Sequence, residues 1–510
     1  MAFNHPLLTG MSPADREVFA KSLRDSLTGA NGVQNVSTGE MLKTATANVG
    51  VTTPLGLLGY PLEAPAKLLY PVPTPLRNSI PREVVGGNAI NYRTITAINK
   101  GNLWGSVAEA TSATTGRNSF ISFDEADKTL TFKSVEMETL LTPEAQFGAN
   151  SRITPGQDFQ AEEFATLSLL QSTMLAEEML DLGGNVTALG AGPTCTKTGV
   201  TQAVTNVGSL TNGTNYYVAV SGLTLQGYRA GVTGQGGTGS DVQGETVATE
   251  VTIATTAGGN AGDKAITIKW PALKGAVAYN VYIGAATGVA NSKYFGTYTS
   301  CGASGVTVDS VPATARANGA DKTANALDYD GLVALCNAST AGYYKDFGGA
   351  TFTGDSTTGV EEFDAAFLSF FNTYKVSPDA VWVNATQKKK IDQIIMGSAA
   401  PIVRIEGQMG SQDFVGTMAV KSVMNRYLGA EVPIKVHPFL PAGTALMVTQ
   451  NLGAYYPNSR IANNLTKHLS WDYRKIDYAL AERGREMGVD FRGALTNYAP
   501  FAMGVLQNIA

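Results

Sequence analysis

Two stretches of alternating apolar and polar residues lie on either side of a polar segment rich in Gly, Ser and Thr. The stretches cover residues 89–98 and 120–137, and the polar segment covers 105–118. Alternation with a period of two is typical of strands with one apolar face, so the pattern predicts a long two-stranded arm. Isolated hairpins are marginally stable in water. We therefore expect the arm either to fold onto its own domain or to lie across another subunit.

The strongest helical pattern lies at residues 158–182, where apolar residues recur near helical spacing until Gly183 and Gly184 end the run. A helix of this length, at ~1.5 Å per residue, is roughly 37 Å long and spans a whole domain. It carries the glutamates Glu162, Glu163, Glu177 and Glu178. No histidine stands at metal-ligand spacing, so we interpret these carboxylates as a solvated acidic edge rather than a di-metal site.

The residues from 190 to 320 are rich in Gly and Thr, have a strand pattern and differ from both neighbouring segments. Apolar positions alternate at 266–270 and again at 279–283, so each run has one apolar face. We predict an all-β sandwich inserted into a larger body. The residues predicted for its core are Trp270, Tyr279 and Val281. A domain inserted with its ends close together folds by itself, so replacing it with a short linker should leave the rest competent to assemble.

The pattern after the insert mixes helices and strands. The predicted elements are helices at 326–340 and 359–374, a strand at 380–383 followed by a helix, two strands within 432–457, and an apolar strand at the end of the chain. They show no regular βαβ alternation, so the predicted fold class is α+β.

The insert resembles a fibronectin type III or immunoglobulin-like domain, which has a buried Trp on one strand and Tyr-x-Val-Tyr on the next. Here Trp270 closes the run ITIKW, and YNVY follows at 279–282. The run NGTNYYVAV at 212–220, which is similar to a late strand of that fold, precedes the Trp270 strand. Either a permuted sandwich or one and a half modules fits this order.

Composition narrows the function classes. The 510 residues suffice for two to four domains, and 37 Lys and Arg against 42 Asp and Glu give a net charge of −5 without a long basic run. A strong global affinity for nucleic acid is therefore not indicated. Three irregularly spaced cysteines favour buried thiols in a reducing compartment. We find no standard export signal and no membrane-spanning run.

Motifs of catalysis are also missing from the sequence. No phosphate-binding loop with a following Lys-Ser/Thr occurs, and His5, His437 and His468 have no Ser, Cys or second His at triad or metal spacing. We predict that the chain is not an enzyme and has no catalytic, cofactor-binding or metal site.

The order of arm, long two-stranded loop, long helix and α+β domain resembles the major capsid protein of tailed bacteriophages. The stretches that carry the resemblance are IPRE (80–83), WGSVAEA (104–110), FISFDEADKTLTFKSVEMETLLTPE (120–144) with the helix after it, DYDGLVAL (328–335), PDAVWVNATQKKKI (378–391) and IKVHPFLPAGTAL (434–446). The resemblance implies the following division: an N-terminal arm at 1–80, an extended loop with flanking peripheral-domain strands at 81–147, a spine helix of the peripheral domain at 148–188, the inserted immunoglobulin-like sandwich at 189–320, an axial domain at 321–480 and a C-terminal return to the peripheral domain at 481–510.

The resemblance also implies a function. Such subunits assemble as hexamers and pentamers into an icosahedral shell around double-stranded DNA, here with the sandwich displayed on the outer surface. The implied partners are other copies of the chain, a portal protein, scaffold or decoration proteins, and packaged DNA held by nonspecific contact, without a membrane. The implied location is the virion, assembled in the host cytoplasm. The loop residues expected at contacts between subunits are Tyr92, Ile95, Trp104, Glu109, Phe120, Phe123 and Phe132.

Two other classes stay open. One is an encapsulin-like nanocompartment shell with an enzyme cargo in place of a genome. The other is a cell-surface adhesion protein that uses the sandwich for binding. The lack of a standard export signal argues against this second class.

Overall fold

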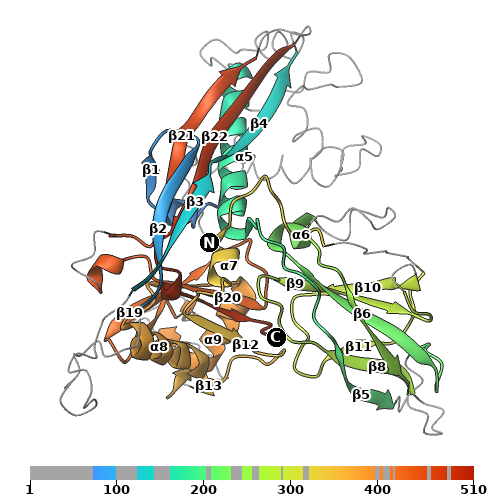
Figure 1. Cartoon of the computed structure of the whole chain (residues 1–510). Helices are drawn as coiled ribbons and strands as arrows, with labels where there is room; N and C mark the ends of the chain where they lie inside the picture. The colour runs from blue at the N-terminus through green and yellow to red at the C-terminus, as the bar shows by residue number, and fades with distance from the viewer. Residues whose placement is uncertain are drawn as a thin grey trace, which may run out of the picture.

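The computed structural model describes residues 73–98, 123–142, 161–202, 208–230, 244–255, 263–288, 291–313, 321–355, 357–396, 403–405, 414–416, 420–455, 461–478 and 484–510. These residues form three regions (Figure 1). One is elongated and combines a long helix, a four-stranded sheet and a two-stranded ribbon. The second surrounds a six-stranded sheet, and the third is a unit of two smaller sheets.

The elongated region has a sheet with the order β1-β21-β22-β4. Its strands are β1 (Arg82–Val84), β21 (Leu465–Asp477), β22 (Arg485–Asn497) and β4 (Lys133–Leu141). Helix α5 (Ala161–Gly183) covers most of the predicted 158–182 helix and packs along this sheet. Ala165 and Leu169 of α5 lie in one buried cluster with Leu141, Met487 and Val489 of the strands. The apolar stripe of the helix is thus buried against the sheet.

The ribbon consists of β2 (Ala89–Ile98) and β3 (Phe123–Thr131), paired antiparallel. The sequence pattern predicted one strand from 120 to 137, but the structure divides it after Thr131. Phe132 leaves the ribbon, and the following β4 pairs with β22 instead. The alternation continues across the division because one face of each strand is partly covered, at Ala126 and Leu130 in β3 and at Val135 and Met137 in β4. The pattern alone therefore does not mark the change of partner.

The six-stranded sheet has the order β12-β23-β20-β15-β19-β18. Its strands are β12 (Tyr343–Asp346), β23 (Met503–Gln507), β20 (Thr444–Val448), β15 (Ala380–Val383), β19 (Ala430–Val436) and β18 (Ser422–Asn425). Helices α8 (Glu361–Tyr374) and α9 (Ala385–Met396) pack on one face, where Val381 and Val383 meet Phe363 and Phe367. Strand β15 and helix α8 lie at or within one or two residues of the predicted bounds, because strong local patterns specify them.

The two-sheet unit follows α5. Its four-stranded sheet has the order β10-β9-β6-β7, and its three-stranded sheet has the order β11-β8-β5. The strands are β5 (Thr196–Gln202), β6 (Asn215–Leu223), β7 (Thr249–Ala254), β8 (Asp263–Lys269), β9 (Ala278–Gly284), β10 (Lys293–Tyr298) and β11 (Val306–Val308), with the short helix α6 (Leu225–Ala230) after β6. Both sheets contribute to one buried cluster. The unit is therefore one body with a single core.

Shorter elements complete the described chain. They are the 3-10 helices η2 (Arg77–Ser79), η5 (Leu452–Ala454) and η6 (Pro500–Ala502), helix α7 (Leu332–Cys336), and the strand pairs β13 (Gly354–Asp355) with β14 (Gly359–Val360) and β16 (Val403–Ile405) with β17 (Phe414–Gly416).

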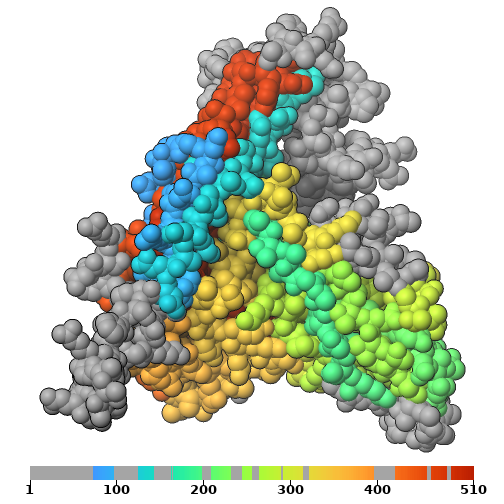
Figure 2. Space-filling model, in the orientation of Figure 1, coloured from blue at the N-terminus to red at the C-terminus, as the bar shows by residue number. Residues whose placement is uncertain are grey.

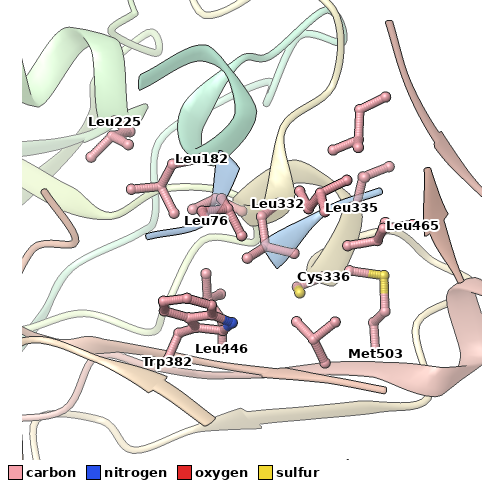
Figure 3. Packing of buried hydrophobic residues seen from close by; sticks show 14 of the residues in the cluster. Leu76, Leu182, Leu225, Leu332, Leu335, Cys336, Trp382, Leu446, Leu465 and Met503 are labelled. Carbon is pink, nitrogen blue, oxygen red and sulfur yellow. The ribbon is translucent and has the colours of Figure 1, made fainter. Parts of the chain in front are cut away.

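The three regions meet in one hydrophobic cluster, which we call the junction core (Figure 3). Its members include Leu76, Ile80, Phe132, Leu182, Leu225, Val277, Leu332, Leu335, Cys336, Trp382, Leu446, Leu465 and Met503. Leu225 and Val277 come from the two-sheet unit, so this unit shares a core with the rest of the chain. In the space-filling view it forms a green lobe beside the orange six-stranded region, and the elongated region rises above both (Figure 2).

Two strands lie outside the regions that the sequence predicted for them. Strand β21 falls within the segment expected to form the axial domain, yet it pairs with β22 in the elongated region. Strand β23 falls within the expected C-terminal return, yet it lies between β12 and β20 in the six-stranded sheet. The last residues of the chain therefore belong to the second region. The sequence pattern did not predict this, because the strands that pair with β23 are distant in sequence.

Candidate functional site

Three carboxylates in the last two turns of α5 lie in the interior of the protein. Glu177 and Glu178 are 0% exposed and Asp181 is 1% exposed. The interpretation of Glu177 and Glu178 as a solvated edge was therefore wrong. Glu162, on an earlier turn, does lie near the surface, where it pairs with Lys475 and Arg485 at 2.5 Å each. Glu163 lies outside the described side chains.

Glu178 anchors the N-terminal segment. Its carboxylate accepts hydrogen bonds from the main-chain amides of Leu76 (2.9 Å) and Arg77 (2.7 Å), at the start of η2. This short helix has no side-chain cap of its own, so Glu178 supplies the acceptor that its first amides need. His437 Nε2 lies 2.6 Å from Glu178 Oε1 and is fully buried. His437 therefore has a structural role in this cluster.

Glu177 is surrounded by cations. Arg82 Nη1 lies 2.6 Å and Arg77 Nε 3.0 Å from its carboxylate, Lys467 Nζ lies 3.5 Å away, and the Tyr473 hydroxyl donates to it. Burial opposes ionisation of Glu177, but the charges of Lys467 and Arg82 outweigh it and hold its pKa below the usual value. Glu177 is therefore the ionised centre of the cluster.

Asp181 lies at the other end of the same cluster, with Lys467 and Tyr329. The Tyr329 hydroxyl donates to Asp181 Oδ1 at 2.5 Å, and Lys467 Nζ donates to the same oxygen. Burial raises the pKa of Asp181 above its usual value. Burial and the nearby Asp181 also raise the pKa of Tyr329 well above its usual value, so this phenol keeps its proton.

These contacts join segments that are far apart in sequence: η2, β1, α5, the start of the turn after β19, and β21. We call this set of charged and phenolic groups the buried charge cluster; its members are Arg77, Arg82, Glu177, Glu178, Asp181, Tyr329, His437, Lys467 and Tyr473. Removing one partner of a buried ion pair typically costs about 3–5 kcal/mol, because the other charge stays uncompensated. Within the described residues, no group of His, Cys, Asp and Glu has the arrangement of a metal site.

The predicted loop contacts take different places. Tyr92 packs against Tyr498 with ring centroids 5.4 Å apart, and burial raises its pKa to about 12. The amide of Ile95 donates to Tyr498 O at 2.9 Å, and its side chain packs near Phe501. Much of both side chains thus lies against the chain's own C-terminal part.

Phe132 corrects the prediction of a contact between subunits. It is 3% exposed and belongs to the junction core, so its ring is not available to a neighbour. For Phe123 only the backbone is described, paired with Ile98. Trp104, Glu109 and Phe120 lie outside the described residues.

The residues predicted for the insert core lie together. Trp270 is 2%, Tyr279 1% and Val281 0% exposed, and the rings of Trp270 and Tyr279 have centroids 5.7 Å apart. Cys195 and Cys301 belong to the same cluster as free thiols, and Cys336 is free in the junction core. The seven described strands β5 to β11 form two sheets around this one cluster.

Comparisons with known proteins give structural matches only. No family model matches the chain, and no curated protein matches it in sequence. The cyanophage A-1(L) capsid structure is 8% identical with a TM-score of 0.38, over 86% of this chain and 94% of that chain. The capsid of an empty GTA particle is 10% identical with a TM-score of 0.36, over 87% and 92%. The satellite phage P4 procapsid is 12% identical with a TM-score of 0.31, over 98% of both chains.

These TM-scores and identities do not assign the chain to a family. In addition, no helix among the described residues is long and apolar enough to cross a membrane.

Proposed function

We propose that this chain is a major capsid protein, which assembles through copies of itself into a closed icosahedral shell of hexamers and pentamers around double-stranded DNA. The observation that carries the proposal is the uncovered apolar edge of the elongated region. Val84 is 62% and Val85 49% exposed, on and just after β1, the edge strand of the four-stranded sheet. Neighbouring copies would cover this edge.

An exposed apolar edge strand is a site for pairing with another chain. Among the described residues β1 pairs only with β21, and the two exposed valines follow the charged Arg82 and Glu83 at the end of this strand. In a free monomer the two valines would lose the stabilisation of burial, about 1.5–3 kcal/mol for each full side chain. Repeated contacts of this kind add up over a shell of many copies.

The element order supports the same function. Among the described residues, a two-stranded ribbon, a long helix and a second α+β region follow each other, in the order that the sequence resemblance implies. The ribbon has no core of its own, so the side of it that does not face the chain's C-terminal part is available to neighbours. The last described residues of the proposed N-terminal arm are held by Glu178, which accepts hydrogen bonds from the amides of Leu76 and Arg77.

The two-sheet unit is proposed to be an immunoglobulin-like domain displayed on the outer surface. The neighbours β9, β6 and β7 occupy the places of strands C, F and G in that fold, with β10 beside β9 as an extra edge strand. The strand in the place of F thus precedes the Trp270 strand in sequence, as expected for a permuted domain. Its two ends lie together, since the amide of Asn325 donates to Asn185 O at 2.9 Å.

The proposed partners are further copies of the chain, a portal protein, scaffold or decoration proteins, and packaged DNA held by nonspecific contact. The proposed location is the virion, after assembly in the host cytoplasm. No catalytic role is proposed for the buried charge cluster, which we assign to holding the segments of one subunit together.

Assembly of the purified chain tests the proposal. Electron microscopy and light scattering should show capsomers or closed particles, and the double variant Val84→Ser, Val85→Ser should lose them while keeping the circular dichroism of the folded chain. Val311→Ser, at an exposed valine of the two-sheet unit, is the matched control and should assemble normally. A stable monomer at all protein and salt concentrations would refute the proposal. Extracted contents separate a DNA-filled particle from a compartment with a protein cargo.

A further inference from the structure

The segments that enter and leave the two-sheet unit form an apolar surface beside the elongated region. The amide of Asn325 donates to Asn185 O at 2.9 Å, so the two segments lie side by side. Leu327 is 79% exposed, more than any other large apolar side chain among the described residues. Four further apolar residues next to the bond are exposed as well. We call the five residues the neck patch; its members are Val186, Ala188, Ala324, Ala326 and Leu327.

The turn that carries Leu327 is held firmly in place. Lys133 Nζ donates to Ala326 O at 2.7 Å, and the amide of Leu327 donates to Asn325 Oδ1 at 3.0 Å. Asn325 Nδ2 donates in turn to Asp328 Oδ1 at 2.9 Å. Leu327 is therefore presented to solvent by a fixed turn. A surface that is already fixed loses little conformational entropy when a partner covers it.

The neck patch and the exposed valines lie at opposite edges of the four-stranded sheet. The order β1-β21-β22-β4 places β1 at one edge and β4 at the other, on the left and on the right in Figure 1. Val84 and Val85 are at the β1 edge. The neck patch is next to the β4 edge, because Lys133, which holds its turn, is the first residue of β4. The two surfaces do not meet within one chain, so a contact between them joins two copies.

We propose that Val84 and Val85 of one copy pack on the neck patch of the next copy, an inference that rests on the proposed shell function. Hexamers and pentamers are rings, and a ring needs a head-to-tail contact between two different surfaces. A surface that binds its own twin closes into a dimer instead. Each copy in the ring thus covers the valines of one neighbour, and the other neighbour covers its own.

The two surfaces complement each other in the size of their side chains. Gly86 and Gly87 follow the valines, and a side-chain carbon added at either position would meet no atom within 4 Å. The bare backbone there leaves room for Leu327 of the next copy. In return, the three alanines of the neck patch leave room for the two valines.

The charges beside the two surfaces have opposite signs. Glu83 comes directly before Val84, and its side chain is 65% exposed. Lys133 brings its ammonium to the turn of the neck patch. Two aspartates of the neck, Asp321 and Asp330, accept hydrogen bonds from main-chain amides of the neck itself. Glu83 of one copy and Lys133 of the next therefore favour the proposed register, since complementary charges at the rim of a contact fix its orientation.

Mixing two blocked variants of the full chain tests the contact. Val84→Asp with Val85→Asp blocks the valines and keeps the neck patch, whereas Ala326→Asp with Leu327→Asp does the reverse. Each variant alone should stay a monomer in light scattering under conditions in which the wild-type chain assembles. The equimolar mixture should form a one-to-one dimer and stop there, since one working contact is left. Circular dichroism should show that both variants fold, because all four side chains are exposed.

The outcomes separate this contact from the proposed function. Val311→Asp is the matched control at another exposed valine and should assemble like the wild type. A mixture that stays monomeric would overturn the contact and leave the proposed function standing, and so would normal assembly of the chain with Ala326→Asp and Leu327→Asp. A wild-type chain that never assembles would refute the proposed function and the contact with it.

Engineered cysteines report the direction of the contact. The three native cysteines are buried as free thiols. A chain with both Val85→Cys and Leu327→Cys should give, after oxidation of assembled particles, a ladder of linked chains up to hexamers on a non-reducing gel. Each single variant should run as a monomer. A linked dimer from Val85→Cys alone would show that the valines meet their own twins, and it would overturn the head-to-tail arrangement.

Discussion

The side chain of Asn508 binds the main chain of Trp270: its Nδ2 donates to Trp270 O at 3.2 Å. Its Oδ1 accepts from the amide of Cys301 at 2.9 Å. The neighbouring Gln507 Nε2 donates to Ala276 O at 3.0 Å. Three hydrogen bonds, from the last residue of β23 and the residue after it, thus tie the end of the chain to the two-sheet unit. The unit is held in a fixed orientation by the six-stranded region.

Replacing Asn508 by alanine should lower the free energy of unfolding by about 2–4 kcal/mol. Two buried hydrogen bonds, at about 1 kcal/mol each, would be lost. Asn508 also has a φ of 59°, in the left-handed region, where alanine costs roughly a further 1–2 kcal/mol. Asn508→Gly removes the bonds but avoids this strain, so its loss should be smaller. Urea unfolding measures both, and identical losses would contradict the contribution of the backbone angle.

Removing the two-sheet unit should destabilise the remaining chain. From the sequence we expected the chain with 190–320 replaced by a linker to stay competent to assemble, and the adjacent ends at Asn185 and Asn325 make such a linker possible. However, Leu225 and Val277 are each 1% exposed in the junction core. Their loss should lower the unfolding free energy by at least about 3 kcal/mol, since single large core truncations cost 2–5 kcal/mol.

Thermal unfolding of the linker variant against the whole chain checks this expectation. The isolated segment 190–320 serves as the companion sample, and it should fold alone because it has its own core. An unchanged midpoint of thermal unfolding for the linker variant would mean that the remaining residues of the junction core repack into the space left by Leu225 and Val277.

Phe132→Ala should destabilise the unassembled subunit by about 3–5 kcal/mol, the usual cost for a buried phenylalanine. Phe132→Leu keeps most of the volume and should cost less. Both are measured by urea unfolding under conditions that prevent assembly. A variant with normal subunit stability and weakened particles would restore Phe132 as a contact between subunits.

Stability should fall when the pH drops below about 6.5, in part because of His468. Its side chain is buried against Glu83 and Tyr498, and burial lowers its pKa below 6.5. The folded chain therefore takes up this proton less readily than the unfolded chain. The contribution of His468 to the free energy of unfolding is complete above pH 6.5 and is lost as the pH falls toward the pKa that His468 has in the folded chain.

His468→Gln should flatten this part of the stability profile between about pH 7 and 5. Glu83→Gln should steepen it, because the charge of Glu83 raises the pKa of His468 and its removal increases the shift. Thermal unfolding in a series of buffers measures both profiles. A wild-type profile in the His468→Gln variant would assign the acid sensitivity to other groups.

The sequence was sufficient for elements with strong local patterns. Strand β15 and helix α8 were predicted because their apolar positions and adjacent turns are local. The sequence did not predict that the strand pairing changes at Phe132, from β2 before it to β22 after it. An alternating pattern is the same in a ribbon and in a sheet. Strand β23 was assigned to the wrong region for a similar reason: an apolar strand does not specify its neighbours.

The buried charge cluster was misread for a different physical reason. Glu177 and Glu178 are compensated by Arg82, Lys467 and amides near Arg77, all of them about 95 or more positions away. Adjacent glutamates look solvated when only their own helix is considered. The available signal was their position close to Leu180 and Leu182, which continue the apolar stripe into the junction core.

Because only Phe132 separates β3 from β4, the ribbon and the four-stranded sheet share one continuous length of backbone (Figure 1). A pull on the ribbon is thus transmitted as tension along this strand into the β4–β22 ladder, whose hydrogen bonds are loaded in shear over nine residue pairs. No loop lies between the two to absorb the displacement. A displacement of the ribbon would therefore also displace the four-stranded sheet and the helix α5 that packs on it.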